Sequence, residues 1–234
     1  MFSKPRKAAT VAILKNKTST DEFEVLLLKR HKQDRFLPSY YVFPGGGIDE
    51  QDNIPGKKDC SIKTDKKNKD DFDVYLYAMG AIRETFEESG FLLARNSKGD
   101  FVSISKDADI EKYSNYRTMV YENQLSFNEM LKIEKLEPAI ESIHYLSRWI
   151  TPVFSPIRYD TRFFTVLAPE NQYIMHDGIE LVETRWMTPK EALSCYKSKK
   201  MKMVVPTIST LEFFASFESS HDVIKHLTDK GGIK

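Results

Sequence analysis

The sequence predicts an α+β sandwich, in which helices cover a β-sheet. Two observations support this prediction. Segments with the apolar pattern of strands are spread along the whole chain, and helical segments lie between them without regular strand–helix alternation. The chain has 234 residues, of which 41% are hydrophobic, so it can bury one large core. We therefore expect a single domain over residues 1–234.

The strand-like segments begin near the N-terminus. Ala8–Leu14 and Glu24–Arg30 are apolar runs separated by a polar, turn-prone stretch. Tyr40–Pro44 is a short aromatic segment that leads into three consecutive glycines. These glycines predict a loop whose backbone adopts positive φ or closely approaches another group. Later in the chain, Arg162–Ala168 and Leu181–Met187 also have the pattern of strands.

Three segments have the pattern of helices. Tyr75–Ser89 has apolar residues at helical spacing and is followed by a glycine that suits a helix C-cap. Thr188 starts a second helix, because Thr is a good N-cap, Pro189 suits the first helical position and Glu191 completes a capping box. Thr207–Glu218 has the pattern of a last amphipathic helix.

Two segments interrupt this order of strands and helices. Residues 53–73 are rich in Lys and Asp, so we expect a polar, solvated insertion loop. Residues 105–147 alternate charged and apolar residues at mostly helical spacing, which predicts a helical insertion.

Composition limits the classes of function. The net charge is only +1, which argues against a protein that binds nucleic acid through bulk charge. Cys60 and Cys195 lack the spacing of a zinc site or a disulfide scaffold, and they fit a reduced compartment. The N-terminal apolar run is too short to cross a membrane, and the C-terminus lacks a peroxisomal S-K-L-type signal. We expect a cytoplasmic protein that binds neither nucleic acid nor membrane.

The helix from Tyr75 carries three carboxylates on one face. Glu84, Glu87 and Glu88 stand at positions i, i+3 and i+4. Such like charges destabilise an exposed helix by roughly 0.2–0.5 kcal/mol per pair, a cost that a hard divalent cation reverses. Arg83 precedes Glu87 by four residues and can orient its carboxylate. Alone, such a pattern is usually a solvated acidic face, so the surrounding sequence decides its meaning.

The surrounding sequence resembles the Nudix box. Arg83–Phe91 matches the second half of the box, R-E-U-x-E-E-x-G-U, at every fixed position. Gly46–Asp52 resembles the first half, G-x5-E, with Asp52 in place of the glutamate. The family has seven residues between this acid and the arginine, whereas this chain has thirty, residues 53–82. The polar insertion loop therefore interrupts the box.

This resemblance implies an α/β/α sandwich with a mixed sheet and a site for Mg²⁺ or Mn²⁺. The implied metal ligands are Glu84, Glu87, Glu88 and the carbonyl of Gly46. A carboxylate must also accept the proton of the water that attacks phosphorus. We expect the catalytic residues among Glu84, Arg83, Glu180 and Glu183, although the last two can also be interpreted as surface acids beside a strand.

Further motifs are similar to the peroxisomal-type coenzyme A diphosphatases. These enzymes share a long insertion inside the box, and Trp149–Pro152 followed by Arg158–Phe164 is also similar to them. Before the box they have L-L-T-x-R-[SA]-x3-R-x3-G-x3-F-P-G-G. Arg30, Arg35 and the F-P-G-G are in register with this motif, and the departures from it are at Leu28, His31 and Ser39.

The substrate expected from this resemblance is coenzyme A or acyl-coenzyme A, cleaved to 3′,5′-ADP and (acyl-)4′-phosphopantetheine. Arginine can bind phosphate with two N–H groups, which suits this small-molecule nucleoside diphosphate derivative. The expected substrate-binding residues are Arg30, Arg35, Lys29 and Phe43. The alternatives are a diphosphatase for ADP-ribose, NADH or nucleotide sugars, and a Nudix-fold binding module without catalysis. A homodimer also stays open.

Overall fold

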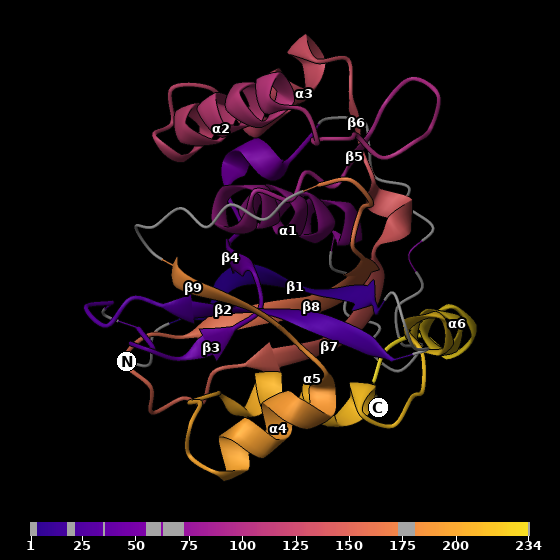
Figure 1. The fold of residues 1–234 in the computed structure, drawn as a ribbon. Helices are drawn as coiled ribbons and strands as arrows, with labels where there is room; N and C mark the ends of the chain where they lie inside the picture. Colours follow the sequence, from indigo (N-terminus) through magenta and orange to yellow (C-terminus); the bar gives the residue numbers. More distant parts are fainter. Residues whose placement is uncertain are drawn as a thin grey trace.

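A central sheet with helices on both faces forms the fold (Figure 1). The computed structural model describes residues 4–17, 22–34, 36–54, 62, 73–172 and 181–233. In these residues the main sheet has seven strands, and a second, separate sheet has two strands. The predicted sandwich is confirmed.

The main sheet is mixed. Its central path runs β3 (Tyr41–Val42), β2 (Phe23–Arg30), β1 (Arg6–Asn16), β8 (Tyr159–Leu167) and β7 (His144–Ile150). Beside this path, β4 (Gly45–Gly47) pairs with β1, and β9 (Leu181–Met187) pairs with β2. Only the central pair β1–β8 is parallel among the described pairs of this sheet.

Helices form layers on each side of the sheet (Figure 1). One face is covered by α1 (Val74–Ser89), and α2 (Asp107–Tyr121) and α3 (Phe127–Ile133) lie outside it. The other side carries α4 (Pro189–Lys197), α5 (Val205–Phe214) and α6 (Ser220–Lys230). None of the helices in the described residues has the length and apolarity that crossing a membrane requires.

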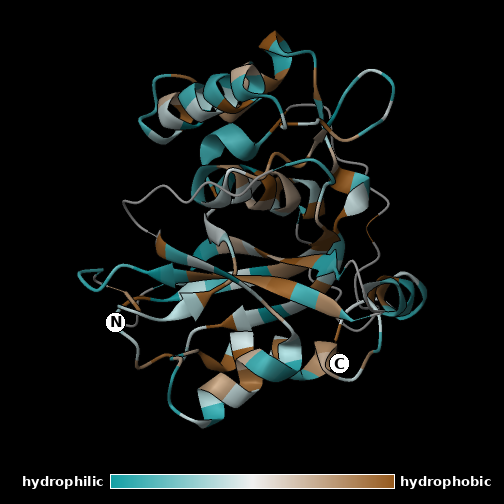
Figure 2. Cartoon of the chain, viewed as in Figure 1, coloured by the Kyte–Doolittle hydropathy of each residue, from teal (hydrophilic) through white to brown (hydrophobic). Residues whose placement is uncertain are grey.

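Both faces of the sheet are apolar. The strands carry apolar residues at successive positions, and these point alternately into two cores, one on each face. In β2, Leu26 and Leu28 pack in the core under α1, whereas Val25 and Leu27 pack in the core under α4 and α5. Figure 2 shows hydrophobic residues concentrated along the strands of the sheet. The same alternation places consecutive polar residues at the end of β2 on opposite faces.

The predicted C-terminal end of α1 and the predicted N-terminal end of α4 are confirmed. Gly90 has φ +76° and donates its N–H to the Phe86 carbonyl, so it terminates α1 as expected. Thr188 caps α4 with the predicted capping box, and Pro189 is in the first turn. The last predicted helix corresponds to α5, while α6 was not predicted.

The three glycines differ from the predicted loop, because they form the short strand β4 against β1. The expected close approach is present at Gly45, which has φ +153°, and a Cβ there would lie 2.3 Å from the Ala9 carbonyl oxygen. Local sequence therefore indicated a special backbone, whereas the pairing that makes it a strand is non-local.

The helical prediction for residues 105–147 is wrong in its C-terminal part. Helices α2 and α3 lie inside the range. After them come β6 (Glu137–Pro138), which pairs with β5 (Ala94–Arg95), a 3₁₀ turn and the start of β7. Pairing of β7 with β8 decides the conformation there, and a short window cannot show it. Most of the expected polar loop, residues 55–61 and 63–72, lies outside the described residues.

Candidate metal and phosphate site

The three box glutamates lie in one cleft, of about 290 Å³, where α1 faces β4. The cleft joins segments that are far apart in the sequence. Its lining residues are Arg30, Gly45, Gly46, Gly47, Glu84, Glu87, Glu88, Tyr121 and Tyr159. The structure therefore brings together the expected acidic residues, the glycines and one of the expected phosphate-binding arginines.

Arg83 is buried beside this cleft, at 4% exposure, and connects its parts. Its Nη1 donates to Glu84 Oε1 at 3.0 Å and to Glu87 Oε1 at 2.9 Å. Its Nη2 donates to the Gly47 carbonyl at 2.8 Å. The predicted orientation of Glu87 by Arg83 is confirmed. Arg83 is buried and does not line the cleft, so its contacts are those of a residue that orients Glu84 and Glu87, and its catalytic role stays a prediction.

Asp52, whose role the sequence left open, is the other partner of Arg83. It is 2% exposed, and its Oδ1 and Oδ2 accept from Nε and Nη2 of Arg83 at 2.8 and 3.1 Å. Gly80 allows this approach, because a Cβ there would lie 2.9 Å from Asp52 Oδ2 and 2.5 Å from Ile48 Cδ1. Asp52 therefore connects the first half of the box to Arg83 and does not line the cleft.

Strand β4 contacts two of the carboxylates directly. The N–H of Gly45 donates to Glu88 Oε2 at 2.7 Å. A Cβ on Gly46 would lie 2.5 Å from Glu84 Oε2, so this position requires glycine while Glu84 keeps its place. The glycines and the glutamates are thus fitted to each other across the cleft.

Burial disfavours the charged form of two of these carboxylates, Glu84 and Glu87. It raises the pKa of Glu84 to about 7, while Arg83 lowers that pKa and the charge of Glu87 raises it. Burial also raises the pKa of Glu87, again against the effect of Arg83. Burial disfavours the charge of Arg83 as well, but hydrogen bonds to Asp52 and the nearby Glu84 and Glu87 raise its pKa.

The carboxylate oxygens of the cleft are of the kind that bind a hard divalent cation, although they do not form a compact cluster of three. In the described part of the chain, no three carboxylate, imidazole or thiol side chains are arranged to hold a metal ion. Arg83 binds one oxygen of Glu84 and one of Glu87, which leaves the second oxygen of each for a cation. Oxygen donors are those that Mg²⁺ and Mn²⁺ prefer.

Replacement of Gly46 by alanine tests the fit between β4 and α1. The added methyl group would displace the Glu84 carboxylate, so we expect kcat to fall by roughly 10²-fold, the scale of one misplaced catalytic group. Gly47→Ala is the matched control, since its methyl group would meet no atom within 4 Å. Steady-state kinetics of both variants measure the difference, and equal rates would contradict the predicted contact.

The structure corrects the roles expected for Lys29, Phe43 and Glu183. Lys29 and Glu183 pair at 3.2 Å on the face under α4 and α5, where Tyr41 Oη also donates to Glu183 at 2.9 Å. Phe43 is 2% exposed in the same core. The cleft is on the other face, so these residues do not reach it. Because successive side chains of a strand point to opposite faces of the sheet, Lys29 and Arg30 lie on different faces, although both belong to the same sequence motif.

Glu183 is also a poor candidate for a general base. Burial acts to raise its pKa, but hydrogen bonds from Arg185, Tyr41 and Lys29 outweigh this effect and lower it. Such a carboxylate keeps its proton only at acidic pH. The other two expected residues, Arg35 and Glu180, lie outside the described residues.

Arg30 lies in the cleft as expected. Its Nε donates to the Phe36 carbonyl at 3.1 Å and pairs with Asp34 Oδ2 at 3.0 Å. Tyr159, which sequence reasoning did not single out, lies next to it in the lining and packs its ring against Phe36 with centroids 5.3 Å apart. Tyr159 belongs to the Arg158–Phe164 motif, so this motif is the sequence feature that could have indicated its place in the cleft.

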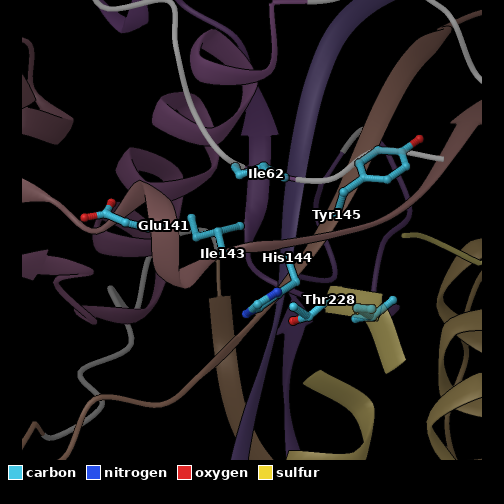
Figure 3. A pocket seen from close by; sticks show the side chains of 7 residues that line it. Ile62, Glu141, Ile143, His144, Tyr145 and Thr228 are labelled. Carbon is cyan, nitrogen blue, oxygen red and sulfur yellow. The ribbon is translucent and has the colours of Figure 1, made fainter. Parts of the chain in front are cut away.

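A second hollow, of about 160 Å³, lies between the start of β7 and α6 (Figure 3). Its described lining residues are Ile62, Glu141, Ile143, His144, Tyr145, Leu227 and Thr228. Burial lowers the pKa of His144, so this imidazole is neutral at pH 7. With one carboxylate and no lysine or arginine among these residues, the hollow has no chemistry for a metal-bound pyrophosphate.

Comparison with known proteins identifies the family. The family model described as the NUDT19 Nudix domain matches residues 57–213, more than half of the chain and all three glutamates of α1. The chain belongs to the Nudix hydrolase family. Its box is interrupted between Asp52 and Arg83, and the buried ion pair between these residues joins the two halves.

Curated relatives of this Nudix chain include acyl-coenzyme A diphosphatase NUDT19 from Xenopus laevis. That protein is 30% identical over 249 residues, which cover 91% of this chain and 65% of the relative. The protein of the same name from Homo sapiens is 26% identical over 241 residues, 87% of this chain and 63% of the relative. The chain therefore spans less than two thirds of the length of these relatives.

A solved structure supports the fold over nearly the whole chain. The crystal structure of a NUDIX hydrolase from Alicyclobacillus acidocaldarius superposes with a TM-score of 0.81 at 26% identity. The match covers 96% of this Nudix chain and 97% of that structure. The match therefore supports the Nudix fold for the described part of the chain.

Proposed function

We propose that this Nudix chain is a divalent-metal-dependent pyrophosphohydrolase that cleaves coenzyme A or acyl-coenzyme A to 3′,5′-ADP and (acyl-)4′-phosphopantetheine. The observation that carries this proposal is the convergence of three box glutamates and Arg30 in one cleft. The names of the curated relatives support the choice of substrate.

The proposed roles follow from the lining of the cleft. Glu84, Glu87, Glu88 and the Gly46 carbonyl would hold Mg²⁺ or Mn²⁺, which supplies positive charge to the pyrophosphate oxygens. Arg30 would bind a phosphate oxygen from β2. Glu84 is our candidate for the base that accepts the proton of the attacking water, because its carboxylate lines the cleft directly opposite Gly46 of β4.

A product assay tests this function. The purified protein is incubated with Mg²⁺ and, in separate reactions, with coenzyme A, acetyl-coenzyme A, ADP-ribose, NADH and a UDP-sugar, and the nucleotide products are separated by ion-pair chromatography. We expect 3′,5′-ADP to be released fastest. Faster release of AMP or UMP would replace the substrate proposal, and no turnover of any compound would favour a binding module. The cytoplasmic location and the homodimer stay predictions from the sequence.

Metal affinity is expected to depend on pH through Glu84. Below about pH 7 this carboxyl holds a proton in the metal-free protein, and a cation must displace it. Affinity for Mg²⁺ should therefore fall by up to about tenfold per pH unit below 7 and level off above it. Isothermal titration calorimetry at pH 6, 7 and 8 measures this effect. Glu84→Gln is the control that should show a weaker dependence on pH, and equal affinity of the wild type at all three pH values would contradict the prediction.

A further inference from the structure

Arg117 attaches the helical insertion to the residues that carry the site. It is 7% exposed in α2, and its Nε donates to the Glu87 carbonyl at 2.6 Å. Its Nη2 donates to the Glu88 carbonyl at 3.0 Å. A buried guanidinium requires partners of this kind, and a cation at the C-terminal end of a helix interacts favourably with its dipole. The contact therefore joins α2 to the last turn of α1.

The face of α2 that carries Arg117 continues into the cleft. Tyr113, Arg117 and Tyr121 are spaced four residues apart, so they lie on one face of the helix. Tyr113 is 4% exposed in the core under the α1 side of the sheet, and Tyr121, the last residue of α2, lines the cleft with the three glutamates. Figure 1 shows α2 outside α1 on the same side of the sheet.

A neighbouring contact of α2, with Glu134, includes Tyr113, whose Oη donates to Glu134 Oε2 at 3.5 Å. Lys112 Nζ donates to Glu134 Oε2 at 2.7 Å, and Tyr116 Oη donates to Glu134 Oε1 at 3.0 Å. Glu134 follows α3, so this contact joins the two helices of the insertion. It supplies a control, because its residues do not line the cleft.

We propose that α2 forms one wall of the substrate site, where the ring of Tyr121 contacts the planar base of the nucleotide and Arg117 positions that ring. This inference rests on the proposed function. Tyr121 and Tyr159 are the aromatic side chains among the described lining residues, whereas Arg30 and the glutamates supply the charged part of the cleft. Aromatic rings stack on any of the nucleobases, so such a contact suits the base of a nucleoside diphosphate derivative.

Kinetics of Tyr121 variants test the contact. Tyr121→Ala should raise KM for coenzyme A by about tenfold or more, the scale of one lost stacking contact, with kcat and the Mg²⁺ midpoint unchanged. Tyr121→Phe should remain near the wild type, because the ring is kept. Tyr116→Ala removes a ring of the same size from the other contact of α2 and should leave KM unchanged. An equal rise in KM for Tyr116→Ala, or an equal loss for Tyr121→Phe, would overturn the assignment.

A double-mutant cycle tests the role of Arg117. Arg117→Met should raise KM as Tyr121→Ala does, and Arg117→Lys should restore part of the affinity. The double variant Arg117→Met/Tyr121→Ala should be no worse than the single variants if Arg117 acts through Tyr121. Additive effects would overturn this positioning role. Thermal melting of each variant shows whether it is folded, and only folded variants are compared in the cycle.

Direct binding separates this inference from the proposed function. Binding of 3′,5′-ADP in the presence of Mg²⁺, measured by calorimetry, needs no turnover. Weaker binding by Tyr121→Ala than by the wild type would support the wall even if no hydrolysis were found. Full hydrolysis of coenzyme A by the wild type, together with unchanged binding by Tyr121→Ala, would overturn the wall and keep the proposed function.

Discussion

Replacement of Glu88 by glutamine is expected to reduce kcat by about 10²–10³-fold while the protein stays folded. Metal-assisted stabilisation of charge contributes several kcal/mol, and each 1.4 kcal/mol changes a rate about tenfold. The glutamine keeps the volume, and its carbonyl can accept the hydrogen bond that Gly45 N–H donates to Glu88 Oε2 at 2.7 Å. The substitution therefore removes mainly the negative charge.

Glu183→Gln is the matched control for this prediction, because it makes the same chemical change on the opposite face of the sheet. Its kcat should remain close to that of the wild type. Product formation from coenzyme A, with circular dichroism to verify folding, compares the two variants. A near-normal rate for Glu88→Gln would show that the box does not hold the catalytic metal, and a strong loss for Glu183→Gln would contradict the face assignment.

Replacement of Arg83 by methionine is expected to lower the free energy of unfolding by about 3–5 kcal/mol, the scale of a broken buried ion pair. Asp52 is 2% exposed and would keep a buried charge without its partner, and Glu84 and Glu87 would repel each other without a shared cation. Urea unfolding in metal-free buffer measures the loss.

The control is the double variant Arg83→Met/Asp52→Asn, which also removes the uncompensated charge of Asp52. It should be more stable than the single variant, because an amide is less costly to bury than a carboxylate. A single variant within 1 kcal/mol of the wild type, on the order of an exposed ion pair, would mean that Arg83 and Asp52 are solvated. Equal stability of the single and double variants would assign the loss to Glu84 and Glu87.

The parts of the fold that depend on neighbouring residues could be predicted from the sequence. Helix α1 and the capping box at Thr188 follow from spacing over a few turns, so their predicted and observed bounds agree closely. Strand β7 could not be predicted in the same way, since its conformation is decided by pairing with β8. Strand β4 could not be predicted for the same reason, because the glycines form a strand only through their pairing with β1.

The candidate site shows the same division. The glutamates share a cleft because helical spacing fixes their common face, and this face is visible in the sequence. Lys29 and Glu183 were misplaced because a motif assigns roles without asking which face of a strand a residue occupies. Tyr121 and Arg117 had no local signal, since their proximity to the cleft depends on how α2 packs against α1.

The ion pair between Asp52 and Arg83 allows the length of the segment between them to vary. Thirty residues lie between these two in the sequence, yet they meet in a buried ion pair at 2.8 Å. The two halves of the box are therefore held in register by this pair and not by the length of chain between them. A change in the length of residues 53–73, before α1, can therefore occur without moving the carboxylates, so this segment can diversify while the chemistry of the site stays constant.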